Sequence, residues 1–308
     1  MNIALFILRR AAAALLLIAA GGAQAAIPAT QRQYLLDFHA ATSGAGWTNS
    51  TGWGGAPGTE CTWFGVYCDA AETTVTRLEV SSNNLVSPVG TPLPDWSALP
   101  DLQWLTMSNN TLTGPVPAIA SLTQLSVFNL SDNNFTGALP DPSGLPVLER
   151  YQLYGNRFSG AIPALTGLPT LTQFLVWNNQ LTGGIPDLSG MPALEYFSVR
   201  INQLTGPLRA LPAGLLRILV DTNQLTGALP APPAGLLPNA SMLCPNLLIP
   251  APNVAWDAAA TGATPWYDGC SGVAPGATAI PTLSEWALVL MSALAAAMGL
   301  AALRRKLS

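Results

Sequence analysis

Few side chains in this chain of 308 residues could carry out catalysis. Its one histidine, His39, has no serine, cysteine or acid placed near it in a catalytic motif, so we expect it to be hydrogen-bonded or solvated. Glu149 and Glu195 hold equivalent positions in a repeated pattern, but two carboxylates alone are weak support for acid–base chemistry. No glycine-rich phosphate loop follows a strand pattern. We therefore expect no catalytic residue and no cofactor.

Aromatic rings and arginines at repeated spacing have instead the chemistry of binding. Exposed Trp, Tyr and Arg side chains are typical of binding hot spots, and aromatic faces can also stack on sugar rings. The alternative is that these side chains only shield the strands beneath them. We predict the following ligand-binding residues: Trp104, Arg150, Tyr154, Trp177, Tyr196, Arg200 and Arg217.

Asparagines that recur every 23 residues from Asn110 to Asn202 define the elements that position these side chains. Apolar residues precede each asparagine in the frame L-x-x-L-x-L-x-x-N, which indicates a leucine-rich solenoid. Each frame predicts a short parallel strand with alternate side chains inward, so outward side chains form rows across a concave face. The predicted binding residues lie two or six positions before an asparagine. The asparagines themselves should satisfy backbone groups in the turns.

After each asparagine the chain continues as in Leu112-Thr113-Gly114, often followed by Ile-Pro or Leu-Pro. This pattern resembles the plant-type leucine-rich repeat. The resemblance implies an α/β repeat solenoid, a right-handed superhelix with parallel strands on its concave face and about eight repeats over residues 75–248. Residues 26–74 resemble the N-terminal cap of plant-type repeat ectodomains, with a helix expected over 31–42. Residues 249–279 should form a C-terminal cap and a spacer.

The four cysteines stand two in each predicted cap. In an exported chain they indicate disulfides, which we expect between Cys61 and Cys68 and between Cys244 and Cys270. A zinc site would need four ligands close together, whereas these pairs belong to opposite ends of the repeat array. We therefore expect no metal site.

Both ends of the chain have the pattern of targeting segments. Residues 1–25 have the charged, apolar and small-residue order of a secretory signal peptide. At the other end, residues 287–303 are apolar and precede a basic cluster, which predicts a transmembrane helix with the bulk of the chain, and its N-terminus, outside. The sorting motif before this helix comprises Ile280, Pro281, Thr282, Leu283 and Trp286.

Residues 280–308 together resemble the IPTL-type C-terminal sorting tail of Gram-negative bacteria, a relative of PEP-type tails. The resemblance implies a partner, an exosortase-like membrane enzyme, and anchoring that is at least transient. A eukaryotic glycolipid-anchor signal is the competing interpretation, although such tails normally end without basic residues. We expect an exported protein at the cell envelope or surface.

Charge excludes one class of partner. Residues 26–279 contain fifteen acidic and seven basic side chains, a net charge of −8. An acidic surface binds nucleic acid poorly, because phosphate neutralisation supplies most of that affinity. The sequence favours a non-enzymatic surface protein that binds a protein or glycan through its concave face. The alternative is a structural component of the surface or of an exopolysaccharide matrix, without a specific ligand.

Overall fold

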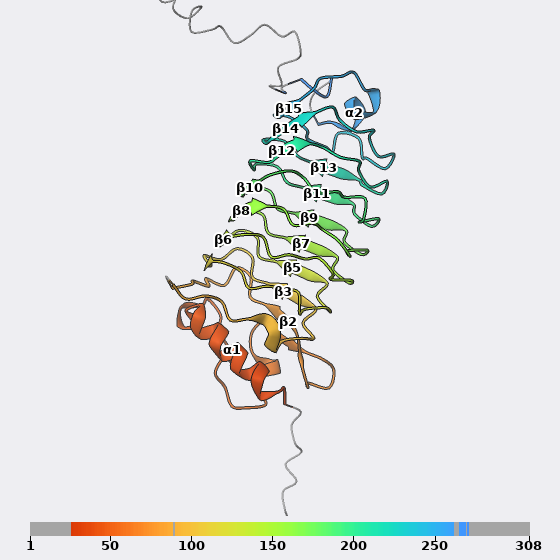
Figure 1. Cartoon of the computed structure of the whole chain (residues 1–308). Coiled ribbons are helices and arrows are strands. Elements are labelled where there is room, and N and C mark those ends of the chain that lie inside the picture. Colours follow the sequence, from red (N-terminus) through yellow and green to blue (C-terminus); the bar gives the residue numbers. More distant parts are fainter. Residues whose placement is uncertain (1–25, 89, 262–264, 269, 271–308) are drawn as a thin grey trace, which may run out of the picture. The chain divides into compact units, whose positions relative to one another are not determined.

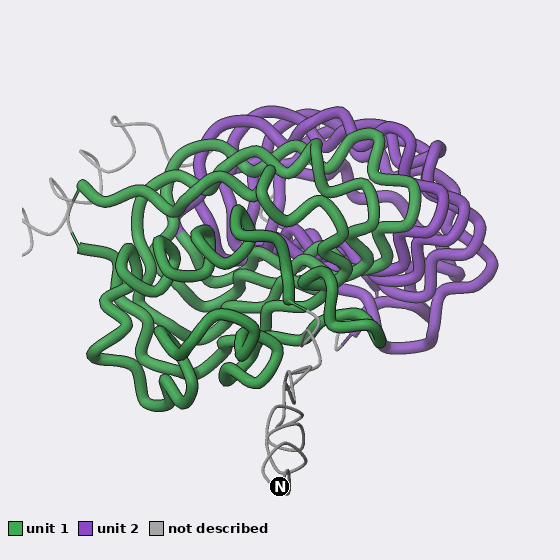
Figure 2. Tube along the Cα trace, turned by 90° about the horizontal axis from the view of Figure 1, so that it is seen from below, with its two compact units in different colours: residues 1–156 green, residues 157–308 purple. Residues whose placement is uncertain are grey.

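The computed structural model describes residues 26–88, 90–261, 265–268 and 270, and they divide into two compact units (Figure 2). Unit 1 ends at Asn156 and unit 2 begins at Arg157. The predicted signal peptide, sorting motif and transmembrane helix at 287–303 lie outside the described residues. Within those residues, no helix combines the length and the apolar character needed to cross a membrane.

Unit 1 begins with the helix α1 (Ala29–Ala41) and then forms a row of stacked strands (Figure 1). In this row β1 pairs antiparallel with β2, and β2, β3, β5 and β7 follow in parallel order. The short strands β4 and β6 form a second parallel pair. The bounds are β1 Val66–Cys68, β2 Val75–Glu79, β3 Trp104–Thr106, β4 Thr113–Gly114, β5 Val127–Asn129, β6 Asn134–Gly137 and β7 Arg150–Gln152, with 3-10 turns at Gly44–Gly46, Glu60–Thr62 and Trp96–Ala98.

Unit 2 repeats this arrangement. Its row of strands is β9, β11 and β13, all parallel, and short strands pair as β8 with β10 and as β12 with β14 and β15. The unit ends with the helix α2 (Val254–Ala259). The bounds are β8 Arg157–Ala161, β9 Gln173–Leu175, β10 Gln180–Thr182, β11 Tyr196–Ser198, β12 Thr205–Pro207, β13 Arg217–Leu219, β14 Gln224–Gly227 and β15 Leu247–Leu248.

The parallel repeat solenoid is confirmed within each unit, but the α/β class is only partly right. Both α-helices of the described residues lie in the capping segments, and the repeats cross back through short strands and turns. Segments such as 114–117, Gly-Pro-Val-Pro, explain this difference. Proline removes a helical hydrogen bond and glycine is costly inside a helix, so no helix forms there.

The asparagines are scaffold residues, as predicted. The side chain of Asn110 accepts hydrogen bonds from the backbone N–H of Asn83 and Leu85 at 3.1 and 2.9 Å, and it donates to the carbonyls of Val80 and Met107. Asn246 in unit 2 makes the same kinds of bonds. Each asparagine thus satisfies backbone groups of two consecutive repeats inside a buried turn.

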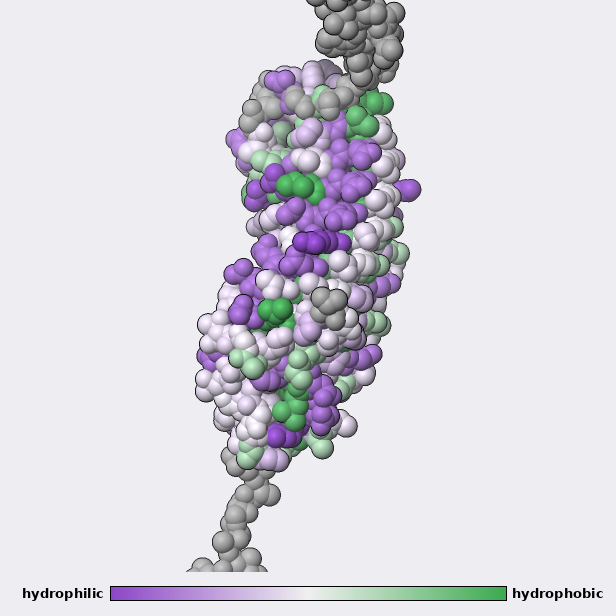
Figure 3. Space-filling view, turned by 90° about the vertical axis from the view of Figure 1, so that its left-hand side faces the viewer, coloured by the Kyte–Doolittle hydropathy of each residue, from purple (hydrophilic) through white to green (hydrophobic). Residues whose placement is uncertain are grey.

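The surface seen in Figure 3 is mainly of polar and intermediate hydropathy, with separate apolar spots, and the short strands of unit 2 turn polar side chains outward. Exposed side chains there include Gln180 and Thr182 in β10 and Gln224 and Thr226 in β14. The inward residues between them, Leu181 and Leu225, are fully buried. This alternation is what a strand with one buried face requires.

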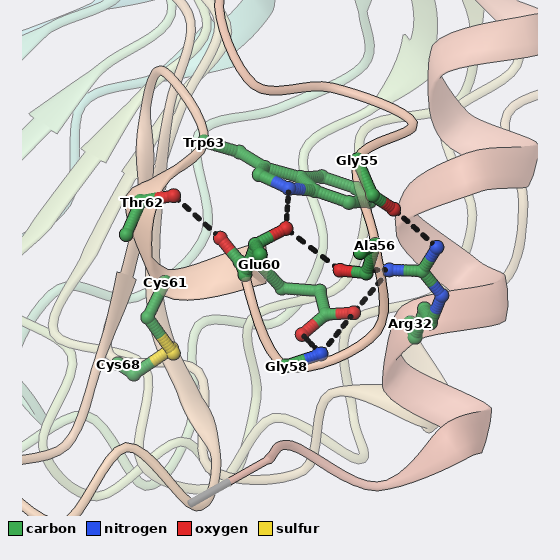
Figure 4. Close-up of polar contacts among 10 residues, drawn as sticks. Arg32, Gly55, Ala56, Gly58, Glu60, Cys61, Thr62, Trp63 and Cys68 are labelled. Carbon is green, nitrogen blue, oxygen red and sulfur yellow. Dashed lines mark hydrogen bonds and ion pairs between the residues drawn. A yellow bond between two sulfur atoms is a disulfide. The ribbon is translucent and has the colours of Figure 1, made fainter. Parts of the chain in front are cut away.

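The N-terminal cap is built around an ion pair between the half-buried Arg32 of α1 and the buried Glu60 (Figure 4). Arg32 also donates to the carbonyl of Gly55 at 2.7 Å and lies over the ring of Trp63, 5.3 Å from its centre. The predicted disulfide between Cys61 and Cys68 is confirmed beside this cluster. These contacts join the helix, the loop and β1 into one cap.

The C-terminal cap is held by two buried tryptophans and by the second predicted disulfide, between Cys244 and Cys270, which is also confirmed. The indole N–H of Trp256 donates to the carbonyl of Pro230 at 2.9 Å, and that of Trp266 donates to the carbonyl of Ala251 at 2.8 Å. Each large ring therefore buries its apolar body and still satisfies its one donor.

Candidate functional site

The strand register of unit 2 places its outward side chains in rows. Tyr196 of β11 pairs with Gln173 of β9 and with Arg217 of β13. Ser198 lies in the same way between Leu175 and Leu219. We call this surface the ladder face of unit 2; it comprises Gln173, Leu175, Trp177, Tyr196, Ser198, Arg200, Arg217, Leu219 and Asp221.

Trp177, Arg200 and Asp221 form the third row of this face, just beyond the strand ends. The N–H of Asn178 donates to the carbonyl of Arg200 at 2.9 Å, and the N–H of Ile201 donates to the carbonyl of Asp221 at 3.0 Å. These bonds continue the parallel ladder past the strands. Three rows thus lie side by side on one face, and only the outer two contain residues that the sequence predicted as binding residues.

A pocket of about 230 Å³ opens on the ladder face. Trp177 and Tyr196 are half-buried in its wall, and Leu175 and Leu219 contribute apolar surface. Arg217 borders the pocket and is held by a bond from its Nε to the carbonyl of Ala240, at 2.8 Å. We call this cavity the aromatic pocket. An apolar cavity with a few polar groups is the usual form of a small ligand site.

Beside the aromatic pocket, Arg200 and Asp221 form an ion pair, with 3.2 Å between a terminal guanidinium nitrogen and Oδ2. Burial raises the pKa of the Asp221 carboxyl above its ordinary value, while the positive charge of Arg200 and a hydrogen bond from Thr222 act in the opposite direction. Asp221 is only 4% exposed, whereas Arg200 is half-buried, and both residues line a second cavity and not the aromatic pocket.

The structure therefore brings four of the predicted binding residues onto the ladder face: Trp177, Tyr196 and Arg217 line the aromatic pocket, and Arg200 lies beside it. Sequence reasoning did not single out the middle row of Leu175, Ser198 and Leu219. The sequence pattern could have identified them, because they lie four positions before an asparagine. Side chains alternate along a strand, so those at two, four and six positions before the asparagine point to the same side.

The other three predicted residues belong to unit 1 and do not line the pocket. Trp104 is covered by the guanidinium of Arg77, which lies 4.2 Å from the ring centre and also bonds Glu79 at 2.6 Å. Arg150 is exposed at the start of β7, and Tyr154 follows two residues after that strand. In the repeat Trp104 corresponds to Tyr196 of unit 2, and this ring of unit 1 is thus already paired with a cation.

The environment of His39 differs from the prediction. Its ring stacks on Trp53, with 5.3 Å between the ring centres, and meets the edge of Trp47. Its Nε2 is buried without a hydrogen-bond partner, and burial lowers the pKa of the imidazole. His39 is therefore part of the aromatic packing of the N-terminal cap. Among the residues that the structure describes, no three His, Cys, Asp or Glu side chains gather as metal ligands.

Two family models match the chain. Residues 124–144 match the Leucine Rich Repeat, and residues 278–305 match the IPTL-CTERM motif. Both parts of the resemblance seen in the sequence are therefore confirmed. No curated protein sequence matches the chain.

Several solved structures that are similar to the chain come from plants. The ectodomain of the receptor kinase GASSHO1/SCHENGEN3 from Arabidopsis thaliana, in complex with CASPARIAN STRIP INTEGRITY FACTOR 2, is 23% identical with a TM-score of 0.52; the match covers 71% of this chain and 30% of that one. A plant ice-binding protein is 24% identical with a TM-score of 0.47, covering 73% and 88%. The ectodomain of the Arabidopsis thaliana receptor kinase SOBIR1 is 26% identical with a TM-score of 0.45, covering 58% and 94%.

Proposed function

We propose that this protein is an exported, non-enzymatic recognition module that binds a protein or glycan through the ladder face of unit 2. The aromatic pocket is the observation that supports the proposal. Its two half-buried rings offer a large apolar contact area, and Arg217 adds a hydrogen-bonding group at the border. Aromatic and arginine side chains in a desolvated pocket are the groups that contribute most to binding.

The side chains of the aromatic pocket favour a binding site over a catalytic site. The pocket wall combines leucines, aromatic rings, one amide, the hydroxyls of Ser198 and Tyr196 and one guanidinium, and it contains no nucleophile next to a base. The Arabidopsis receptor ectodomain, which has a similar fold, is itself in complex with a factor. That likeness supports the fold, and our proposal of binding depends on the pocket.

The proposal also includes the location of the protein. A signal-peptide pattern at residues 1–25, two disulfides and the IPTL-CTERM motif support export to the cell envelope or surface. We propose an exosortase-like enzyme as the partner of the C-terminal tail and a membrane anchor over residues 287–303.

The binding proposal can be tested with the full-length protein on an array of glycans and peptides. We expect a selective hit whose affinity falls by about 30-fold or more in Trp177→Ala and Tyr196→Ala, as for hot-spot residues. Trp104→Ala is the matched control, because that ring lies on unit 1 beneath Arg77. It should change the affinity by less than about 3-fold.

Two results would contradict the proposal. One is a selective hit that both pocket variants keep with unchanged affinity. The other is an array without any selective hit, which is the result expected of a purely structural surface component. Thermal unfolding of each variant checks that the loss of binding does not come from unfolding.

A further inference from the structure

Buried polar atoms without a hydrogen-bond partner gather at one place in unit 2. Six such side-chain atoms occur among the described residues, and three of them are Ser198 Oγ, Arg200 Nε and Asp221 Oδ1. Ser198 is 2% exposed and Asp221 is 4% exposed. Buried polar groups are normally satisfied, so a cluster of unsatisfied ones at a pocket indicates a missing partner.

These three atoms belong to residues that line two cavities of unit 2. Ser198 lines the aromatic pocket, while Arg200 and Asp221 line a second cavity of about 220 Å³. The second cavity is closed on its other side by the C-terminal cap, through Thr261 and Trp266. Because Ser198 and Arg200 are two residues apart on the same ladder, one ligand can reach both cavities.

The hydrogen-bonding capacity of the cluster is mixed. A serine hydroxyl donates and accepts, the Nε–H of arginine only donates, and a carboxylate oxygen only accepts. A ligand that satisfies all three must offer several groups that can each donate or accept. Vicinal hydroxyl groups of a sugar have this property, and the C–H face of the same ring can pack on Trp177 or Tyr196.

The charge balance favours a neutral ligand. Arg200 and Asp221 neutralise each other at 3.2 Å. The described part of unit 2 carries five acidic and four basic side chains, whereas that of unit 1 carries ten and three. A strongly charged ligand would therefore find little net opposite charge on this unit, and it would compete with the existing ion pair.

We propose that the ladder face of unit 2 binds a neutral carbohydrate, with one sugar ring against Trp177 and Tyr196 and its hydroxyls bonded to Ser198, Arg200 and Asp221. This inference rests on the proposed function and names the ligand class. The Arg200 side chain is 33% exposed, so it can turn toward the ligand. Rotation about the Cα–Cβ bond of Ser198 redirects its hydroxyl to the pocket in the same way.

The test uses the full-length protein and an array that combines neutral oligosaccharides of glucose, galactose and mannose, sialylated and sulfated glycans, and peptides. We expect neutral oligosaccharides to be the selective hits. Asp221→Asn should weaken their binding by about 10-fold or more, and Ser198→Ala by about 3- to 10-fold, as expected for lost hydrogen bonds. Glu79→Gln is the control, since it breaks an ion pair with Arg77 on unit 1.

The outcomes separate this inference from the proposed function. Selective peptide binding that Trp177→Ala abolishes and Ser198→Ala leaves unchanged overturns the carbohydrate inference and keeps the recognition module. Neutral-sugar binding that both Ser198→Ala and Asp221→Asn leave unchanged also overturns the inference. Should Asp221→Asn fail to fold, Ser198→Ala and Arg200→Lys decide the question. Hits that both Trp177→Ala and Tyr196→Ala keep with unchanged affinity contradict the proposed function itself.

Discussion

At the scale of single residues, the same residue type has two distinct roles depending on its phase in the repeat. Asn133 is buried and bonded to backbone groups of three segments, whereas its neighbour Asn134 is half-buried at the start of β6. The side chain of Asn133 accepts from Leu112 N at 3.0 Å and donates to the carbonyls of Met107 and Leu130. The contribution of an asparagine to stability should therefore depend on its position in the repeat and not only on its residue type.

Replacing Asn133 with Ala tests this dependence. The change leaves buried backbone groups of two repeats unsatisfied, so we expect the free energy of unfolding to fall by about 3 kcal/mol. Asn134→Ala should cost less than about 1 kcal/mol, because its half-buried side chain lies outside the buried turn. Equilibrium unfolding in urea measures both values. Equal losses in the two variants would show that the buried turn is not what stabilises the repeat.

The binding residues show how far sequence reasoning reaches at this scale. The rows could be predicted because register follows from the period, so Tyr196 had to lie beside Arg217. The contacts and the exposure of each side chain could not be predicted, because they depend on its rotamer and on its neighbours in space. Trp104 and Tyr196 both lie six positions before an asparagine, yet Arg77 covers Trp104 and the aromatic pocket opens at Tyr196.

At the scale of elements, the caps are the parts in which helices and aromatic clusters replace the repeat pattern. Gln31 of α1 caps the strand row by accepting from Val75 N at 2.8 Å, and Arg32 on the next position pairs with Glu60. The helix and both disulfides were predictable from local signals. The aromatic surroundings of His39 were not predictable, because Trp47 and Trp53 lie in the segment after α1 and contact His39 only when that segment folds back onto the helix.

The N-terminal cap should lose stability in acid through His39. Burial lowers the pKa of its imidazole, so the unfolded chain takes up the proton at a higher pH than the folded chain does. The free energy of unfolding should therefore fall as the pH decreases from the ordinary histidine pKa of about 6.5 toward the lower folded value. Above that range the effect is absent.

The control for this effect is His39→Phe, which keeps an aromatic ring between the tryptophans and cannot titrate. Thermal unfolding of both proteins at pH 7.5 and pH 5.5 should show a larger decrease of Tm for the wild type than for the variant. The carboxylates titrate equally in both proteins and cancel in the comparison. Parallel decreases would rule out His39 as the source of the acid sensitivity.

At the scale of the whole molecule, the chain combines two kinds of sequence. The described residues form repeats and caps, and residues 278–305 match a sorting motif. The parallel repeats were predictable in detail because one short pattern is used many times. The α/β class was only partly right, because prolines and glycines after each asparagine favour short strands and turns over helices.

In a Gram-negative host that has an exosortase-like enzyme, the sorting tail of the chain should be cleaved. We expect the mature protein to end near Ile280, because the apolar stretch and its basic end then serve only to present the motif to the enzyme. Mass spectrometry of the C-terminal peptide measures this end. The matched variant Pro281→Ala should remain uncleaved, and Ala274→Ser, a change that lies before the motif, should be processed normally. A mature wild-type protein that still ends at Ser308 would instead show that the tail is a permanent part of the protein.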